Sequence, residues 1–207
     1  MTAAALRDSP PFDWLAPLAS RLKGQTAYRV LLTNPERQLS WTLTSPLTGL
    51  AVDLPAPLGK AAEANWSATP LRVQVGAGAP GRPDLERIEL SLGRLAQVQM
   101  VRRAQGDGRV LQAAVGIGVT EPMALPTQGV ELAVMQDRLN ADAWLAEFGS
   151  ALGWAGAGSG STAGINAGTE ARSSPSVVRA DLMPRQVRIR ARELLVLGRQ
   201  LDEVVAT

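Results

Sequence analysis

Apolar and polar side chains alternate residue by residue along most of this chain. In residues 71–75 the odd-numbered positions are apolar, and in residues 88–92 the even-numbered positions are. Successive side chains of a β-strand point to opposite faces of its sheet, so this alternation is typical of strands with one buried and one solvated face. The chain is therefore predicted to be mainly β.

Further runs with the same period occupy residues 28–33, 39–44, 96–100, 111–119, 130–134, 178–182 and 187–191. Turn-forming stretches such as Asn34–Arg37 and Gln105–Gly108 separate neighbouring runs. About ten short strands joined in this way predict a curved, meander-like antiparallel sheet, either an open groove or folded over as a sandwich. In the run at 111–119, Ala114 and Gly116 lie on a face of small residues, which either marks a bend or lets another backbone approach.

Two short helices are expected beside the sheet. Residues 12–23 carry apolar side chains at helical spacing, and Asn140 is placed to cap a second helix. The apolar stripe of that second helix consists of Trp144, Leu145, Phe148 and Leu152. It either docks a partner or, as we favour, plugs an edge or end of the sheet.

Composition divides the chain into three parts. Residues 1–152 form a β segment with its flanking helices, and residues 177–207 continue the same sheet. Between them, residues 153–176 are rich in glycine and serine and predict a mobile loop. Gly156–Gly160 lacks the Lys-Ser/Thr of a phosphate-binding loop, so we interpret it as linker.

The residue types that are missing restrict the chemistry. The chain of 207 residues is 45% hydrophobic but contains no histidine and no cysteine. Histidine triads, thiolate chemistry and the usual zinc sites are thereby excluded, and no Ser-x-x-Lys motif offers a substitute. A non-enzymatic protein without metal or cofactor is predicted.

Charge and hydropathy restrict the partners. A net charge of +2 with 4% aromatic residues gives no reason to expect nucleic acid. No apolar run approaches the roughly 20 residues that a transmembrane helix needs. The chain itself is expected to contain no membrane span.

Four segments carry a resemblance to a known family. Gly49–Lys60 reads GLAVDLPAPLGK, an alternating strand that ends at Pro55 and Pro57. The others are Leu22–Tyr28 (LKGQTAY), Asp142–Trp144 (DAW) and Arg190–Val204 (RARELLVLGRQLDEV). In this order they resemble the AsmA-like envelope proteins of Gram-negative bacteria, specifically the YhdP type.

The resemblance implies a function. It implies that the full-length protein is a long, curved β-structure, anchored in the inner membrane. The apolar groove of this structure is expected to bridge the periplasm and to conduct phospholipid between the two membranes. This chain is then expected to be an internal periplasmic segment, in contact with neighbouring segments of the full-length protein and with phospholipid acyl chains. The alternative is a non-catalytic scaffold module in envelope assembly.

Candidate site residues follow from the pattern and the resemblance together. The residues expected to line or underlie the apolar face are Leu39, Trp41, Leu43, Leu50, Val52, Leu54, Leu71, Val73, Val75, Ile88, Leu90 and Leu92. The same side chains would equally form an ordinary sandwich core. Arg188, Arg190 and Arg192 form a basic row that either contacts lipid headgroups or, as we favour, is a solvated face that discourages aggregation.

Overall fold

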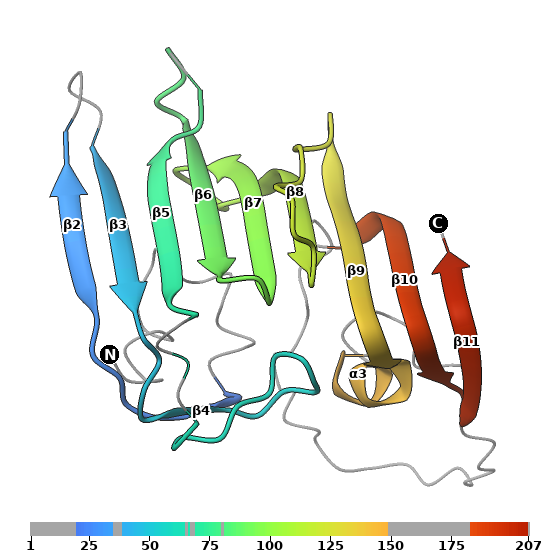
Figure 1. Cartoon of the computed structure of the whole chain (residues 1–207). Coiled ribbons are helices and arrows are strands. Elements are labelled where there is room, and N and C mark those ends of the chain that lie inside the picture. The colour runs from blue at the N-terminus through green and yellow to red at the C-terminus, as the bar shows by residue number, and fades with distance from the viewer. Residues whose placement is uncertain are drawn as a thin grey trace, which may run out of the picture.

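The computed structural model describes residues 20–34, 39–64, 66, 69–79, 81–148 and 183–206. Within these ranges it has eleven strands and one helix (Figure 1). The strands are β1 (Leu22–Gly24), β2 (Arg29–Thr33), β3 (Ser40–Ser45), β4 (Leu50–Val52), β5 (Leu71–Ala77), β6 (Leu85–Leu92), β7 (Ala96–Arg103), β8 (Val110–Ile117), β9 (Gly129–Asn140), β10 (Pro184–Val196) and β11 (Arg199–Ala206). Helix α3 (Ala141–Phe148) follows β9 directly, and none of the described helical residues forms a segment long and apolar enough to cross a membrane.

Nine strands form one open sheet in the order β11-β10-β9-β8-β7-β6-β5-β3-β2. Figure 1 shows them side by side, with β2 at one edge and β11 at the other. This confirms the mainly β, open-sheet prediction. The sheet is mixed rather than wholly antiparallel, because β9 runs parallel to both β8 and β10. Alternation reports which face a residue occupies and not which way its strand runs, so these two crossovers could not be predicted from it.

The strand register aligns apolar residues into unbroken rows across the sheet. One of them, here called the central row, crosses eight strands from β2 to β10. Its members are Val30, Leu43, Val73, Leu90, Val98, Val115, Leu132 and Val187. A second row on the same face contains Leu32, Trp41, Val75, Ile88, Met100, Ala113 and Val130. Ile88, at the middle of this face, is 0% exposed, so the centre of the face is a packed core.

The opposite face of β8 is covered by the chain's own crossover to β9. A Cβ added to Gly116 would lie 3.1 Å from Sδ of Met123. The amide Nε2 of Gln97 donates to the Glu121 carbonyl at 2.6 Å, and that of Gln112 donates to the Thr127 carbonyl at 2.9 Å. At Gly116 the atoms that approach most closely are therefore side-chain atoms of Gln97, Met123 and Val119, and not another backbone.

A second, two-stranded sheet is formed by β1 and β4, in which Leu22 pairs with Val52 and Gly24 with Leu50. The predicted first helix is wrong for its last residues, because Leu22–Gly24 is a strand and residues 20–21 form a turn; residues 12–19 lie outside the described part. The second predicted helix is α3, and its cap is confirmed, since Asn140 Oδ1 accepts a hydrogen bond from the Ala143 amide at 3.0 Å. Leu152, the predicted loop 153–176 and the run 178–182 lie outside the described residues.

Replacing Ile88 by alanine should lower the free energy of unfolding by about 2–5 kcal/mol, because it removes a large side chain from a closed core. Urea denaturation followed by circular dichroism measures this loss. Val205→Ala is the control: Val205 is exposed on β11, and its truncation should change stability by less than about 0.5 kcal/mol. Equal effects of the two substitutions would mean that the apolar face is not the core of the sheet.

Candidate functional site

The apolar face of the large sheet is the first candidate site. Eight of the twelve residues predicted for it lie on this face within β3, β5 and β6. Leu43, Val73, Val75 and Ile88 are buried, and Trp41, Leu71, Leu90 and Leu92 are half-buried. Leu39, directly before β3, is exposed. The buried members underlie the face, while the half-buried ones and Leu39 are partly or largely accessible on it.

Leu50, Val52 and Leu54 are not part of this face. Leu50 and Val52 belong to β4 and pair with β1, while Leu54 lies beyond the end of that strand. The alternating pattern correctly predicted a short strand, Leu50–Val52, but assigned this strand to the wrong sheet. The reason is that Val52 also pairs with Lys60, which closes the segment into its own small loop.

An open cavity of about 370 Å³ lies where the apolar face meets the connection between β5 and β6. Leu39, Trp41, Val75 and Ala77 line its apolar side. No catalytic group was predicted here, and among the described residues no cluster of three or more acidic side chains is placed to hold a metal. The lining favours an apolar ligand.

The charged residues at this cavity are paired with one another. Arg82 donates two hydrogen bonds of 2.8 Å to the carboxylate of Asp84, and these hydrogen bonds lower the pKa of Asp84 and raise that of Arg82. Glu86 accepts a hydrogen bond of 2.8 Å from the buried Arg102. Because these charges are already compensated, the cavity offers little attraction to an ionic ligand.

A second open hollow, of about 900 Å³, lies near β7 and β8 and is lined by Val101 and Gln112 from the opposite face. Two arginines, Arg109 and Arg185, also line it. The sequence analysis missed both of them, because they stand 76 positions apart and become neighbours only through the parallel crossovers.

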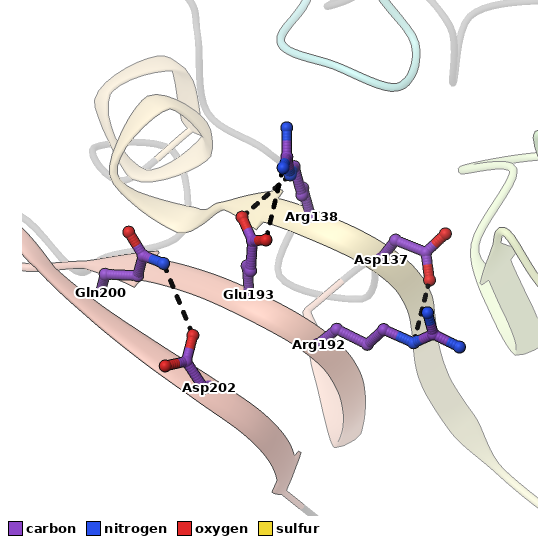
Figure 2. Close-up of polar contacts among 6 residues, drawn as sticks. All are labelled: Asp137, Arg138, Arg192, Glu193, Gln200 and Asp202. Carbon is purple, nitrogen blue, oxygen red and sulfur yellow. Dashed lines mark hydrogen bonds and ion pairs between the residues drawn. The ribbon is translucent and has the colours of Figure 1, made fainter.

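The predicted basic row is present on β10 but is largely neutralised. Arg188 forms an ion pair with Glu131 of β9, and Arg192 lies 3.5 Å from Asp137. Figure 2 shows the second pair beside that of Arg138 with Glu193, which is 2.9 Å long. Arg190 has no ion-pair partner within the described part of the chain. Only this arginine keeps an uncompensated charge in the row.

Beside the sheet lies a second candidate feature, here called the end junction: the loop Leu50–Ala62, helix α3 and the turn at residues 197–198. Lys60 is its centre. It is only 6% exposed, and its ammonium group donates to the carbonyls of Leu50 at 2.9 Å, Ala61 at 3.0 Å and Ala62 at 3.4 Å. The same nitrogen lies 6.0 Å from the centre of the Trp66 ring. These backbone contacts make Lys60 a structural anchor of the loop.

Helix α3 connects this loop to the hairpin of β10 and β11. The indole nitrogen of Trp144 donates to the Ala56 carbonyl at 3.0 Å. On the same helix, the Asp142 carboxylate accepts hydrogen bonds from the amides of Leu197 at 2.6 Å and Gly198 at 2.8 Å. Both residues of that turn have positive φ, 51° and 68°, and Asp142 satisfies the two amides that the turn leaves free.

Comparison with known proteins identifies the family. A family model described as YhdP protein matches residues 2–207. The chain belongs to the YhdP family. The predicted resemblance is thus confirmed, and the chain is a member of an AsmA-like family of envelope proteins. No curated protein and no solved structure matches it.

The segments that carried the resemblance to the YhdP type meet at the end junction. Leu22–Gly24 pairs with Leu50–Val52, Asp142–Trp144 contacts both the loop and the hairpin turn, and Gly198 lies in that turn. These YhdP-type motifs therefore supply the contacts that hold the loop, helix α3 and the β10–β11 hairpin together. The two apolar rows described above, which carry the candidate binding function, are built from residues outside them.

Replacing Lys60 by methionine should destabilise the chain by about 2–3 kcal/mol, because the carbonyls that Lys60 satisfies would remain buried without a donor. Thermal and urea unfolding measure the change. Lys23→Met makes the same replacement on β1, where the side chain is 73% exposed, and should be nearly neutral. A Lys60 variant as stable as the Lys23 variant would contradict the anchoring role.

Replacing Asp142 by alanine should expose the turn of the β10–β11 hairpin. We expect the amides of Leu197 and Gly198 to exchange with solvent at least about tenfold faster, since a hydrogen bond to a charged acceptor contributes about 1.5–3 kcal/mol. Hydrogen–deuterium exchange with residue-level readout tests this. Asp137→Ala, which removes an exposed carboxylate from β9, should leave both amides unchanged.

Proposed function

We propose that this chain is one segment of a periplasm-spanning, inner-membrane-anchored protein that shelters phospholipid and conducts it between the inner and outer membranes along an apolar β surface. The observation that carries the proposal is the set of unbroken apolar rows, above all the central row from Val30 to Val187. Such rows run across the strands, along the direction in which a sheet can be lengthened. Membership of the YhdP family supports this interpretation.

The dimensions and energies are suitable for an acyl chain. Eight strands at a spacing of about 4.8 Å make the central row roughly 34 Å long, and strands of about eight residues are on the order of 25 Å long. Each methylene that leaves water on this surface contributes roughly 0.8 kcal/mol. The surface has to supply only apolar contact, and no bond is made or broken. A non-catalytic role is therefore proposed.

Hydrocarbon would enter at the end of the face rather than at its centre. Ile88 and Val73 are already buried, whereas Leu39 is exposed and Trp41 half-buried at the cavity next to them. The charged side chains around that cavity compensate one another, so an acyl chain meets no unpaired charge there. Arg190 is the member of the basic row left for a headgroup within the described residues, because Arg188 and Arg192 are engaged by carboxylates of β9; it lies on the face of β10 opposite the apolar rows.

The burial of Val73 and Ile88 favours a second candidate function. A core that is closed at its centre needs no ligand to be stable, so the chain can also serve as a structural module that spaces other parts of an envelope assembly. The two functions differ in one measurable respect: a module of this kind binds no phospholipid.

Native mass spectrometry and lipid extraction of the gently purified chain test the proposal. We expect co-purified phospholipid, and we expect Leu39→Asp to weaken binding of a fluorescent phosphatidylethanolamine by at least about tenfold, because a carboxylate at the cavity would have to be desolvated. The matched control is Leu197→Asp, at an equally exposed leucine in the hairpin turn. Absence of bound lipid, or equal losses in both variants, would support the structural module instead.

A further inference from the structure

The apolar face of the large sheet ends in a charged row. Ile88 pairs with Met100 in the second row, and two residues further along these strands Glu86 pairs with Arg102 on the same face. Glu86 accepts the 2.8 Å hydrogen bond from Arg102, and the two side chains are only 22% and 9% exposed. Within the described strands β3 to β8, the register places no other charged side chain on this face. The apolar surface therefore stops at an ion pair.

The cavity of about 370 Å³ beside this row presents one cation and one anion. Among the described residues that line it, Arg82 and Glu86 are the charged ones, whereas their partners Asp84 and Arg102 do not belong to the lining. A positive and a negative group thus border the same space, and each is held by a counter-ion outside it. Because the charges cancel, a ligand with a net charge gains little here, but a ligand that carries both charges is complementary.

Both groups keep hydrogen-bonding capacity. A guanidinium has five N–H donors, and Arg82 uses two of them for Asp84. Glu86 accepts from Arg102 through Oε2, and its Oε1 accepts no hydrogen bond within the described part of the chain. A phosphate can accept from the remaining N–H groups of Arg82, and an ammonium group can donate to Oε1 of Glu86. Hydrogen bonds between charged groups of this kind are shorter and stronger than neutral ones.

We propose that this cavity binds the zwitterionic headgroup of a phospholipid, with the phosphate at Arg82 and the ammonium group at Glu86. This inference rests on the proposed function and adds to it the class of lipid and its orientation. The acyl chains lie against Leu39 and Trp41 on the apolar side of the cavity and continue along the second apolar row, to which Trp41 belongs. Arg190 lies on the other face of the sheet and is not part of this site.

The arrangement discriminates between headgroups. An anionic headgroup such as that of phosphatidylglycerol can bind Arg82 but has no cation for Glu86, whose carboxylate repels its phosphate. Diacylglycerol has neither charge and leaves both side chains without a new partner. Only the zwitterion makes both charge-assisted hydrogen bonds, so the cavity selects it over the other two.

Competition binding to the full chain tests this selectivity. Phosphatidylethanolamine labelled on an acyl chain is bound first and then displaced by unlabelled lipids with matched short acyl chains. Phosphatidylethanolamine should compete at least about fivefold better than phosphatidylglycerol or diacylglycerol, because each of these lacks at least one of the two charge-assisted contacts.

Variants assign the selectivity to the two side chains. Glu86→Leu combined with Arg102→Met removes the carboxylate without leaving a buried charge unpaired, and it should abolish the preference for phosphatidylethanolamine over phosphatidylglycerol. Arg82→Gln, at a side chain that is 58% exposed, should bring both phospholipids close to the level of diacylglycerol. The matched control is Glu89→Gln: Glu89 also belongs to β6 and pairs with Arg87, but on the opposite face, so the preference should be unchanged. Circular dichroism and urea unfolding establish that each variant is folded.

The outcomes separate this inference from the proposed function. Equal competition by phosphatidylethanolamine and phosphatidylglycerol, a preference that survives in the Glu86/Arg102 and Arg82 variants, or a preference lost in Glu89→Gln would overturn the headgroup site and leave the lipid-sheltering face intact. A wild-type chain that binds none of the three lipids would overturn the proposed function and the headgroup site together.

Discussion

The rest of the structure depends on the alignment of apolar residues across neighbouring strands. Each strand contributes an alternating pattern, but only one relative register brings Leu43, Val73 and Leu90 into line. A slip of a single residue would move every apolar side chain of one strand to the solvated face, at a cost of roughly 1.5–3 kcal/mol for each large side chain exposed. The register is therefore held by burial. The curved sheet, its buried centre and its accessible ends all follow from this alignment.

Local structure was largely predictable from the sequence, whereas contacts between distant segments were not. The hairpin of β2 and β3, the strands β5 to β8 and the cap at Asn140 each follow from patterns within a few residues. The pairing of Arg188 with Glu131 joins residues 57 positions apart and depends on a parallel crossover that alternation does not encode. For that reason the basic row was identified correctly while its neutralisation was not foreseen. Leu50, Val52 and Leu54 were assigned to the large sheet because alternation does not tell which strand a run pairs with; Leu50 and Val52 pair with β1, and Leu54 is in neither sheet.

Lys60 shows that a residue of a short motif can have a structural role, here in holding a loop in its conformation. Sequence reasoning placed it at the end of a proline-stiffened turn and gave it no further role. In the fold its ammonium group replaces the water that the carbonyls of Leu50, Ala61 and Ala62 would otherwise bind. The motifs that carried the family resemblance thus supply contacts that hold the fold together, whereas the proposed binding function rests on apolar rows that lie outside these motifs. Family membership and proposed function therefore rest on different parts of the molecule.

The end of the sheet near α3 shows how the apolar surface changes direction. In β10 the inward positions are Val187, Ile189 and Ala191, and then Leu194 and Val196, so the apolar phase shifts by one residue. The shift falls at Arg192, where the regular pairing with both Asp137 and Glu203 is interrupted and Glu203 takes a positive φ. Because β9, β10 and β11 all depart from regular pairing at this level, their strand register is kept. After it, the side chains that face inward are displaced by one residue in the sequence. Leu194 and Leu139 then pack with Trp144 of α3 instead of continuing the flat face. The same deviation therefore both interrupts the pairing of β10 with β11 and closes this end of the sheet onto the helix.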